Sequence, residues 1–243
     1  MSKMLVAAHR GDSYNCYENT LSAFKKAIDV GCDMIETDLR LSLDGEVVLI
    51  HDDKVDRTTN GKGRVDKMTF AELRELNAGD DIIPEKIPTL KELFDLVKDC
   101  DVSLNLEIKE YWSPENEERC IKCVEDTLRL VEEYGFGDRI LINSFDAWVL
   151  EYVYKKYGRK YKLHGFYPYS IMMNVKSSPD EYLFCACIFD NKNKELYDYL
   201  LSKNIEPWIG ASVTQKSLLD ICIKYGARLI TTNNPSDVTE KLR

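Results

Sequence analysis

Short apolar runs rich in β-branched residues alternate along the chain with longer segments of helical periodicity. The runs predict strands at Met4–Ala8, Met34–Asp38, Val102–Ile108, Arg139–Ser144, Tyr161–Phe166, Leu183–Ile188, Ile205–Ile209 and Ala227–Thr231. Helical patterns cover residues 20–30, 89–99, 116–134, 146–157, 192–202 and 214–225, with a weaker one at 169–176 and a last one at 235–242. Such alternation favours parallel strands joined by crossover helices, and eight units predict a closed (β/α)₈ barrel, the TIM-barrel architecture.

An open, doubly wound sheet is the alternative that the same alternation permits. Such a sheet favours a glycine-rich phosphate loop directly after its first strand. The segment that follows the first predicted strand, His9–Asp12, reads His-Arg-Gly-Asp and is not such a loop. We therefore predict the barrel, formed by residues 1–243 as a single domain, since about 250 residues are typical of one barrel.

A hairpin is predicted at the second strand. Leu43–Glu46 is a strong turn signal before a second apolar run at Val47–His51. If the turn is centred between Asp44 and Gly45, the numbers of any two residues that face each other across the hairpin sum to 89. His51 then faces Asp38. Residues 52–88 then form a small insertion, with a helical pattern at Thr69–Asn77, that we expect to overhang the barrel mouth.

The charge balance limits the classes of partner. Lys and Arg number 33 against 42 Asp and Glu, a net charge of −9, which argues against a nucleic-acid or anionic membrane partner. A small anionic substrate remains compatible, because a bound divalent cation reverses the local sign. No apolar run is long enough to predict a membrane span and no signal peptide is visible, so we expect a cytoplasmic protein.

Carboxylates gather where predicted strands end. Glu36 and Asp38 are two positions apart in one strand, so both point to the same face, and Glu107 ends the next barrel strand. Three carboxylates at one end of a barrel repel each other unless a cation compensates them. Oxygen ligands of this kind predict one divalent metal ion, Mg²⁺ or Ca²⁺.

Two of the three histidines fall at the same predicted mouth. His9 ends the first strand and His51 ends the hairpin, and an imidazole pair beside a metal suits general acid and base work on a phosphodiester. Arg10 and Lys109 are the nearby cations suited to phosphate oxygens. His164, without an acidic neighbour in sequence, is interpreted as structural.

The chain resembles the glycerophosphodiester phosphodiesterase family through an ordered series of motifs. They are His9-Arg10-Gly11, Glu18-Asn19-Thr20, Glu36-Thr37-Asp38, Asp44-Gly45, His51-Asp52, Asp56-Arg57-Thr58-Thr59, Gly61, Gly63, Ile87-Pro88-Thr89-Leu90, Glu107-Ile108-Lys109 and Ser144-Phe145. These anchors span the first 145 residues in the order and approximate spacing of the family.

The resemblance implies a barrel enzyme that hydrolyses small-molecule glycerophosphodiesters to sn-glycerol 3-phosphate and an alcohol. The roles that it implies are acid–base catalysis for His9 and His51, metal binding for Glu36, Asp38 and Glu107, phosphate contacts for Arg10 and Lys109, and an aromatic near the pocket for Trp208.

The chain departs from the family pattern at Tyr17, at Ile209–Ala211 and at Thr232–Asn233, where the family usually has Pro, Thr-Val-Asn and Thr-Asp. We expect these positions not to touch the metal or proton-transfer groups, and so to affect substrate preference more than reaction type.

Two other functions compete with this one. A phospholipase D-like barrel acting on intact lipids would need an apolar, membrane-facing rim. A barrel that binds phosphodiesters without turning them over, as a sensor or scaffold, would not need both histidines and all three carboxylates. The sequence predicts no particular oligomeric state.

Overall fold

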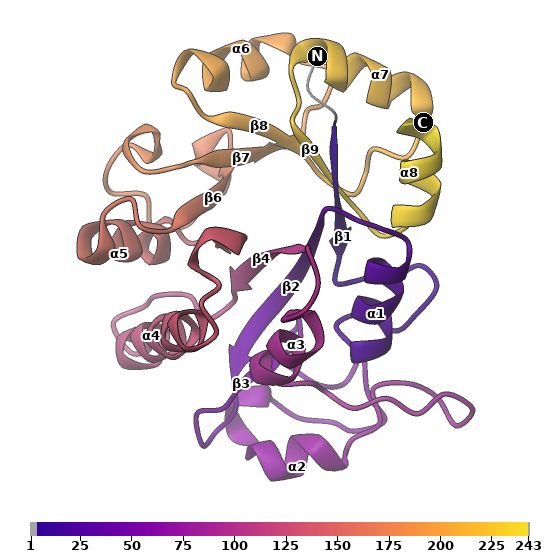
Figure 1. Ribbon diagram of the computed structural model, residues 1–243. Coiled ribbons are helices and arrows are strands. Elements are labelled where there is room, and N and C mark those ends of the chain that lie inside the picture. Colours follow the sequence, from indigo (N-terminus) through magenta and orange to yellow (C-terminus); the bar gives the residue numbers. More distant parts are fainter. Residues whose placement is uncertain (1–3, 243) are drawn as a thin grey trace.

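The computed structural model describes residues 4–242, and within that range eight parallel strands close into a barrel (Figure 1). The barrel strands are β1 (Leu5–His9), β2 (Met34–Leu41), β4 (Ser103–Ile108), β5 (Ile140–Asn143), β6 (Lys162–Tyr167), β7 (Cys185–Ile188), β8 (Glu206–Ile209) and β9 (Leu229–Thr232). Each overlaps a predicted strand. Because β1 pairs with both β2 and β9, the eight parallel strands form a closed ring, which confirms the (β/α)₈ barrel and excludes the doubly wound sheet.

Helices surround the strands on the outside of the barrel (Figure 1). They are α1 (Leu21–Asp29), α3 (Leu90–Val97), α4 (Glu117–Glu133), α5 (Ala147–Tyr157), α6 (Lys194–Ser202), α7 (Lys216–Tyr225) and α8 (Pro235–Leu242). A further helix, α2 (Phe70–Glu75), lies apart from them in the segment that precedes α3 (Figure 1). The weaker helical pattern at 169–176 forms no α-helix and only a short 3₁₀ helix, Tyr169–Ile171. The backbone of Met173 exchanges hydrogen bonds with Phe145 and Ala147, so this segment pairs with the loop after β5 and does not continue as a helix.

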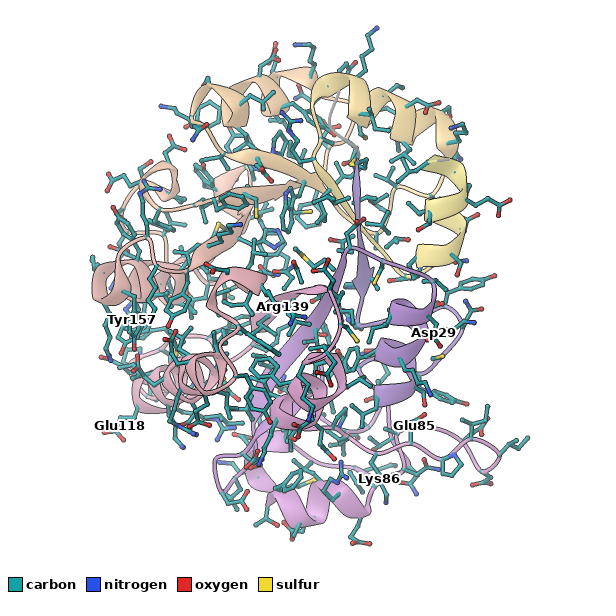
Figure 2. All side chains as sticks on the ribbon, in the orientation of Figure 1. Asp29, Glu85, Lys86, Glu118, Arg139 and Tyr157 are labelled. Carbon is teal, nitrogen blue, oxygen red and sulfur yellow. The ribbon has the colours of Figure 1, made fainter. Side chains whose placement is uncertain are left out.

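Side chains that point into the barrel form an apolar layer near its lower end. The layer consists of Ala7, Met34, Leu141, Cys185, Trp208 and Leu229. Below it, the Arg139 side chain donates hydrogen bonds to the carbonyl oxygens of Val97, Cys100 and Val102, joining the end of α3 to the start of β4 (Figure 2). Groups at this end stabilise the fold, whereas chemistry in such barrels occurs at the carboxyl ends of the strands.

The predicted hairpin is present, but its register differs by one residue. β3 (Val47–Leu49) pairs antiparallel with β2, and Leu39 faces Leu49, so paired numbers sum to 88 and not 89. The cause is a three-residue loop in which Gly45 adopts φ 88°, a left-handed conformation that glycine tolerates. Asp38 therefore lies opposite Ile50, whose N–H donates to the Asp38 carbonyl, and His51 follows directly.

The segment between β3 and α3 has a small core of its own. Its buried residues are Val48, Ile50, Val55, Val65, Leu73, Ala78 and Ile87. α2 lies within the predicted helical pattern and begins at Thr69, which forms a reciprocal capping box with Glu72. The Arg57 side chain bonds Asp52 and Glu18 and thus joins this segment to the barrel mouth. Among residues 4–242, no helix combines the length and apolar character needed to cross a membrane.

Candidate active site

Three carboxylates from two neighbouring strands converge at the carboxyl end of the barrel. Glu36 and Asp38 both face the interior from β2, and the register of β4 sets Glu107 beside Asp38. One potential ligand atom from each side chain lies within 4.8 Å of the other two. All three residues are buried. The structure thus brings together the three carboxylates that the sequence analysis grouped.

Two cations contact this carboxylate cluster. The Lys109 Nζ lies 3.2 Å from Asp38 Oδ1 and also contacts Glu107. The Arg10 Nε lies 3.1 Å from Asp38 Oδ2. When all three carboxylates are ionised, they outnumber these two cations in a buried place, which favours either protonation of a carboxylate or a further cation.

A tight turn after β1 places Arg10. Arg10 and Gly11 have φ angles of 58° and 79°, in the left-handed region. A Cβ on Gly11 would lie 2.6 Å from the backbone carbon of Ala23, so the turn requires glycine. The Arg10 N–H donates to both the carbonyl oxygen and Oε2 of Glu36, at 2.9 and 3.0 Å. These bonds hold the strained residue over β2.

Burial changes the proton affinity of the carboxylates. It raises the pKa of Glu36 to about 8, and the charge of Asp38 adds to the shift. Burial also raises the pKa of Glu107 to about 7, although Lys109 opposes the change. Burial acts on Asp38 as well, but Lys109 and Arg10 outweigh it and hold the pKa of Asp38 below its ordinary value. A cation bound to this cluster would therefore displace protons near neutral pH.

The donor set of the cluster fits a hard divalent cation. Mg²⁺ and Ca²⁺ prefer carboxylate oxygens, and three are available here. The Glu36 Oε1 is buried and lacks a hydrogen-bond partner among residues 4–242. The Asn19 Nδ2 donates to Asp38 Oδ2 at 2.8 Å, which orients that carboxylate as outer-shell groups do in metal sites.

Two imidazoles flank the cluster. The His9 Nε2 lies 3.9 Å from Glu36 Oε2, and its Nδ1 lies 2.6 Å from the side-chain oxygen of Asn233. Because that oxygen only accepts, the contact assigns the proton to Nδ1 and leaves Nε2 able to accept one. The His51 Nδ1 lies 2.6 Å from Asp52 Oδ1. Burial lowers the pKa of both histidines; Arg10 adds to the effect on His9, while Asp38 opposes it at His51.

The contact with Asn233 corrects one expectation. The departures from the family pattern were expected not to touch the proton-transfer groups, yet Asn233 bonds the ring of His9 directly. The two residues are 224 positions apart and meet because β9 is the neighbour of β1 in the closed barrel. A neutral amide therefore orients His9, whereas a carboxylate orients His51.

A cavity of about 380 Å³ opens at these groups. Its lining includes His9, Arg10, Glu36, His51, Asn105, Glu107, Lys109, Asn143, Phe145, His164, Phe166, Cys187, Phe189, Gly210, Ala211, Ser212 and Thr231. We call the side formed by His9, Arg10, Glu36, Asp38, His51, Glu107 and Lys109 the charged half of the mouth. We call the side formed by Asn143, Phe145, His164, Phe166 and Phe189 the neutral half.

Trp208, expected near the pocket, is not among the residues that line this cavity but packs directly against one of them, His164. The Trp208 side chain is buried in the apolar layer of the barrel interior and its ring packs 4.8 Å from that of His164. Trp208 lies below the cavity because its side chain belongs to the apolar layer near the lower end of the barrel. Gly210 and Ala211, which follow β8, reach the cavity.

The neutral half was not predicted from the sequence. His164 was interpreted as structural, but it lines the cavity together with Asn143 and three phenylalanines. The rings of Phe145 and Phe166 stack with centroids 3.5 Å apart, and Phe189 is half exposed. Strand alternation is the signal that could have found His164, since it shares a face of β6 with Phe166.

Comparisons with known proteins place this geometry in a family. Residues 9–180 match the model of the glycerophosphoryl diester phosphodiesterase family. The chain is 36% identical over 254 residues to a glycerophosphodiester phosphodiesterase of Caldanaerobacter subterraneus subsp. tengcongensis, covering 99% of this chain and 98% of the relative. It is 33% identical over 189 residues to a glycerophosphodiester phosphodiesterase of Bacillus altitudinis, covering 73% and 70%.

Solved structures show the same fold. A glycerophosphodiester phosphodiesterase from Thermotoga maritima has 25% identity and a TM-score of 0.78, with the whole of both chains covered. An Oleispira antarctica phosphodiesterase, solved in complex with the product sn-glycerol-3-phosphate, has 22% identity and a TM-score of 0.82 over 99% of this chain and 97% of that one. The resemblance stated from the sequence motifs is confirmed, and the chain belongs to the glycerophosphoryl diester phosphodiesterase family.

Proposed function

We propose that the barrel mouth hydrolyses glycerophosphodiesters to sn-glycerol 3-phosphate and an alcohol. The observation that carries this proposal is the meeting of the three carboxylates and both imidazoles at one cavity. The name of the Caldanaerobacter relative and the product bound to the Oleispira enzyme support the same reaction.

Glu36, Asp38 and Glu107 would hold one Mg²⁺ or Ca²⁺ ion. A divalent cation, when bound, polarises a phosphoryl oxygen and helps to orient the diester. Arg10 and Lys109 contact the carboxylates now and can also turn donors toward the phosphate, because each carries more N–H groups than these contacts use.

His9 and His51 would move the protons. Both have pKa values below the ordinary imidazole value, so both are largely neutral at pH 7. A neutral imidazole can take a proton from the attacking hydroxyl, and its charged form can deliver one to the leaving oxygen. The Asp52 carboxylate favours a proton on His51 in that exchange, and Asn233 fixes the ring of His9.

Product analysis tests this function directly. Glycerophosphocholine, glycerophosphoethanolamine and glycerophosphoinositol are each incubated with the protein, with Mg²⁺ or Ca²⁺ and with excess chelator. We expect sn-glycerol 3-phosphate and the free alcohol with metal, and neither product with chelator. Release of glycerol together with phosphocholine would contradict the proposed cleavage, and turnover that is indifferent to chelator would contradict the metal.

One observation favours a second candidate, cleavage of lipids that retain an acyl chain. Ile171, Met173 and Phe189, on loops after β6 and β7, expose apolar side chains at the end of the barrel that carries the cavity. Vesicles of phosphatidylcholine or lysophosphatidylcholine, assayed beside soluble glycerophosphocholine, separate the two. Faster head-group release from vesicles would favour the lipid substrate.

A further inference from the structure

A row of polar side chains runs across three adjacent strands at the bottom of the cavity. The strand register sets Glu107 of β4 beside Asn143 of β5, and Asn143 beside His164 of β6. All three are buried and line the cavity. The row therefore begins in the charged half of the mouth and continues into the neutral half, away from the cations.

Two buried atoms in this row lack hydrogen-bond partners among the described residues, 4–242. They are the Oδ1 of Asn143 and the Nε2 of His164. Buried polar groups in folded proteins are almost always paired, so an unpaired atom in a residue that lines a cavity points to a ligand or a water molecule. Here two such atoms lie on neighbouring strands of one wall.

The other side of the His164 ring indicates which atom carries the proton. The Nδ1 of His164 lies 3.1 Å from the amide nitrogen of Asn105 and 3.3 Å from its amide oxygen. Taking the shorter contact as the hydrogen bond, we assign the amide as the donor to Nδ1 and therefore assign the proton to Nε2. Burial lowers the pKa of His164 to about 3, so the ring is neutral at pH 7. The wall thus presents one neutral donor beside one neutral acceptor.

The ring of His164 is held in place by its neighbours. Its centroid lies 4.8 Å from that of Trp208 below and 5.3 Å from that of Phe166 beside it. Together with the bond to Asn105, these contacts fix the direction of Nε2. A fixed donor can select a partner of complementary chemistry without a cost of rearrangement.

We propose that Asn143 and His164 bind a hydroxyl of the polyol half of the substrate, with His164 Nε2–H donating and Asn143 Oδ1 accepting. A hydroxyl both accepts and donates, which is what this pair requires. A phosphate or carboxylate would supply no donor for Asn143 and would be directed to Arg10 and Lys109 instead. This inference rests on the proposed function and identifies the wall of the cavity that selects the glycerol group.

The test compares two ligands that differ only in hydroxyl groups. sn-Glycerol 3-phosphate and propyl phosphate share the three-carbon chain and the phosphate, and calorimetry in the presence of Mg²⁺ or Ca²⁺ gives the Kd of each. We expect wild type to prefer glycerol phosphate by about tenfold or more, because a site built for a hydroxyl leaves its polar groups unpaired without one. His164→Phe and Asn143→Leu should each reduce that preference below about threefold and leave the Kd of propyl phosphate nearly unchanged.

Two further variants separate hydrogen bonding from packing. His164→Gln keeps an N–H donor near the same place and should recover part of the preference. Phe166→Leu disturbs the same wall without removing a polar group, so it should change both Kd values together. If His164→Phe and Asn143→Leu weaken both ligands equally, the pair has only a structural role and the inference is wrong.

The outcomes also separate this inference from the proposed reaction. A wild-type protein that hydrolyses glycerophosphodiesters but binds the two ligands equally would show that the wall holds only a water molecule, which overturns the inference alone. A protein that prefers glycerol phosphate but cleaves no diester would contradict the proposed function and leave only the binding of a hydroxyl by Asn143 and His164 standing. Failure to bind either ligand would overturn both.

Discussion

The two halves of the barrel mouth use different chemistry on the same scaffold. The charged half, on β1, β2, β4 and the hairpin, concentrates carboxylates; burial first, and then the neighbouring negative charges, raise the pKa values of Glu36 and Glu107. The neutral half, on β5 to β7, presents stacked rings and two unpaired amide and imidazole atoms. The carboxylates of the charged half repel one another until a cation binds, whereas the side chains of the neutral half are uncharged. We infer that the first performs the reaction and the second selects the substrate.

The largest effect is expected in the charged half at the imidazoles. His51→Ala should lower kcat by about 10²–10⁴-fold, because positioned proton transfer contributes that much. The half-exposed site of His51 should tolerate the change, so circular dichroism and the melting temperature should stay close to wild type. Asp53→Ala, two residues further on and exposed, is the matched control and should keep full activity. Near-normal turnover of His51→Ala would remove it from the reaction.

The next largest effect is expected from the loss of one carboxylate, which should weaken the affinity for the metal. Glu107→Gln keeps the shape but removes a charged ligand, so the metal concentration for half-maximal activity should rise by about tenfold or more. Glu110→Gln is the control, since this buried carboxylate pairs with Arg119 outside the cluster. Equal metal titrations for wild type and Glu107→Gln would place the cation elsewhere.

Without a bound cation, the carboxylate cluster should lower the free energy of unfolding as pH rises. The pKa of Glu36 is about 8 in the folded protein against an ordinary 4.5, so the folded state binds more protons than the unfolded state between these values. Stability in chelator should therefore fall as pH rises from 5 to 9. Glu36→Gln removes this loss of stability, so the difference in Tm between the variant and wild type should grow in favour of the variant as pH rises. Each kcal/mol in the free energy of unfolding changes Tm by about 2–4 °C. An advantage that is the same at pH 5 and pH 9 would contradict the raised pKa.

The smallest effect concerns the orientation of His9. Asn233→Asp replaces the neutral partner of His9 by a carboxylate, as His51 already has, and should raise the pKa of His9 by about one unit. The limb of the pH–rate profile that reports His9 should move to higher pH, whether His9 gives or takes the proton. Asn234→Asp, the adjacent residue, controls for added charge. A profile unchanged by Asn233→Asp would show that His9 does not limit the rate.

The contrast between the halves also explains what the sequence could predict. Strand–helix alternation was sufficient for the barrel, and carboxylates two positions apart in an apolar strand were sufficient for Glu36 and Asp38. The neutral half was missed because Phe145 and Phe166 resemble ordinary core residues and His164 has no acidic neighbour in sequence. The depth of Trp208 could not be predicted, since it depends on the stagger of β8 against its neighbours.

Two other features that the sequence did not predict have different causes. The register of the hairpin depended on the conformation of one residue, Gly45, which moved every pair by one position. The contact between Asn233 and His9 joins the two ends of the chain and depends on closure of the barrel. Short-range patterns carry neither kind of information.

The account depends above all on a cation bound by the charged half. Calorimetric titration of the metal-free protein with Mg²⁺ or Ca²⁺ at pH 7, in two buffers of different ionisation enthalpy, measures both the stoichiometry and the protons released. We predict one ion per chain with net proton release, because Glu36 and Glu107 hold protons near neutral pH, and loss of both signals in Glu36→Gln. Binding that releases no protons and survives Glu36→Gln would contradict the account.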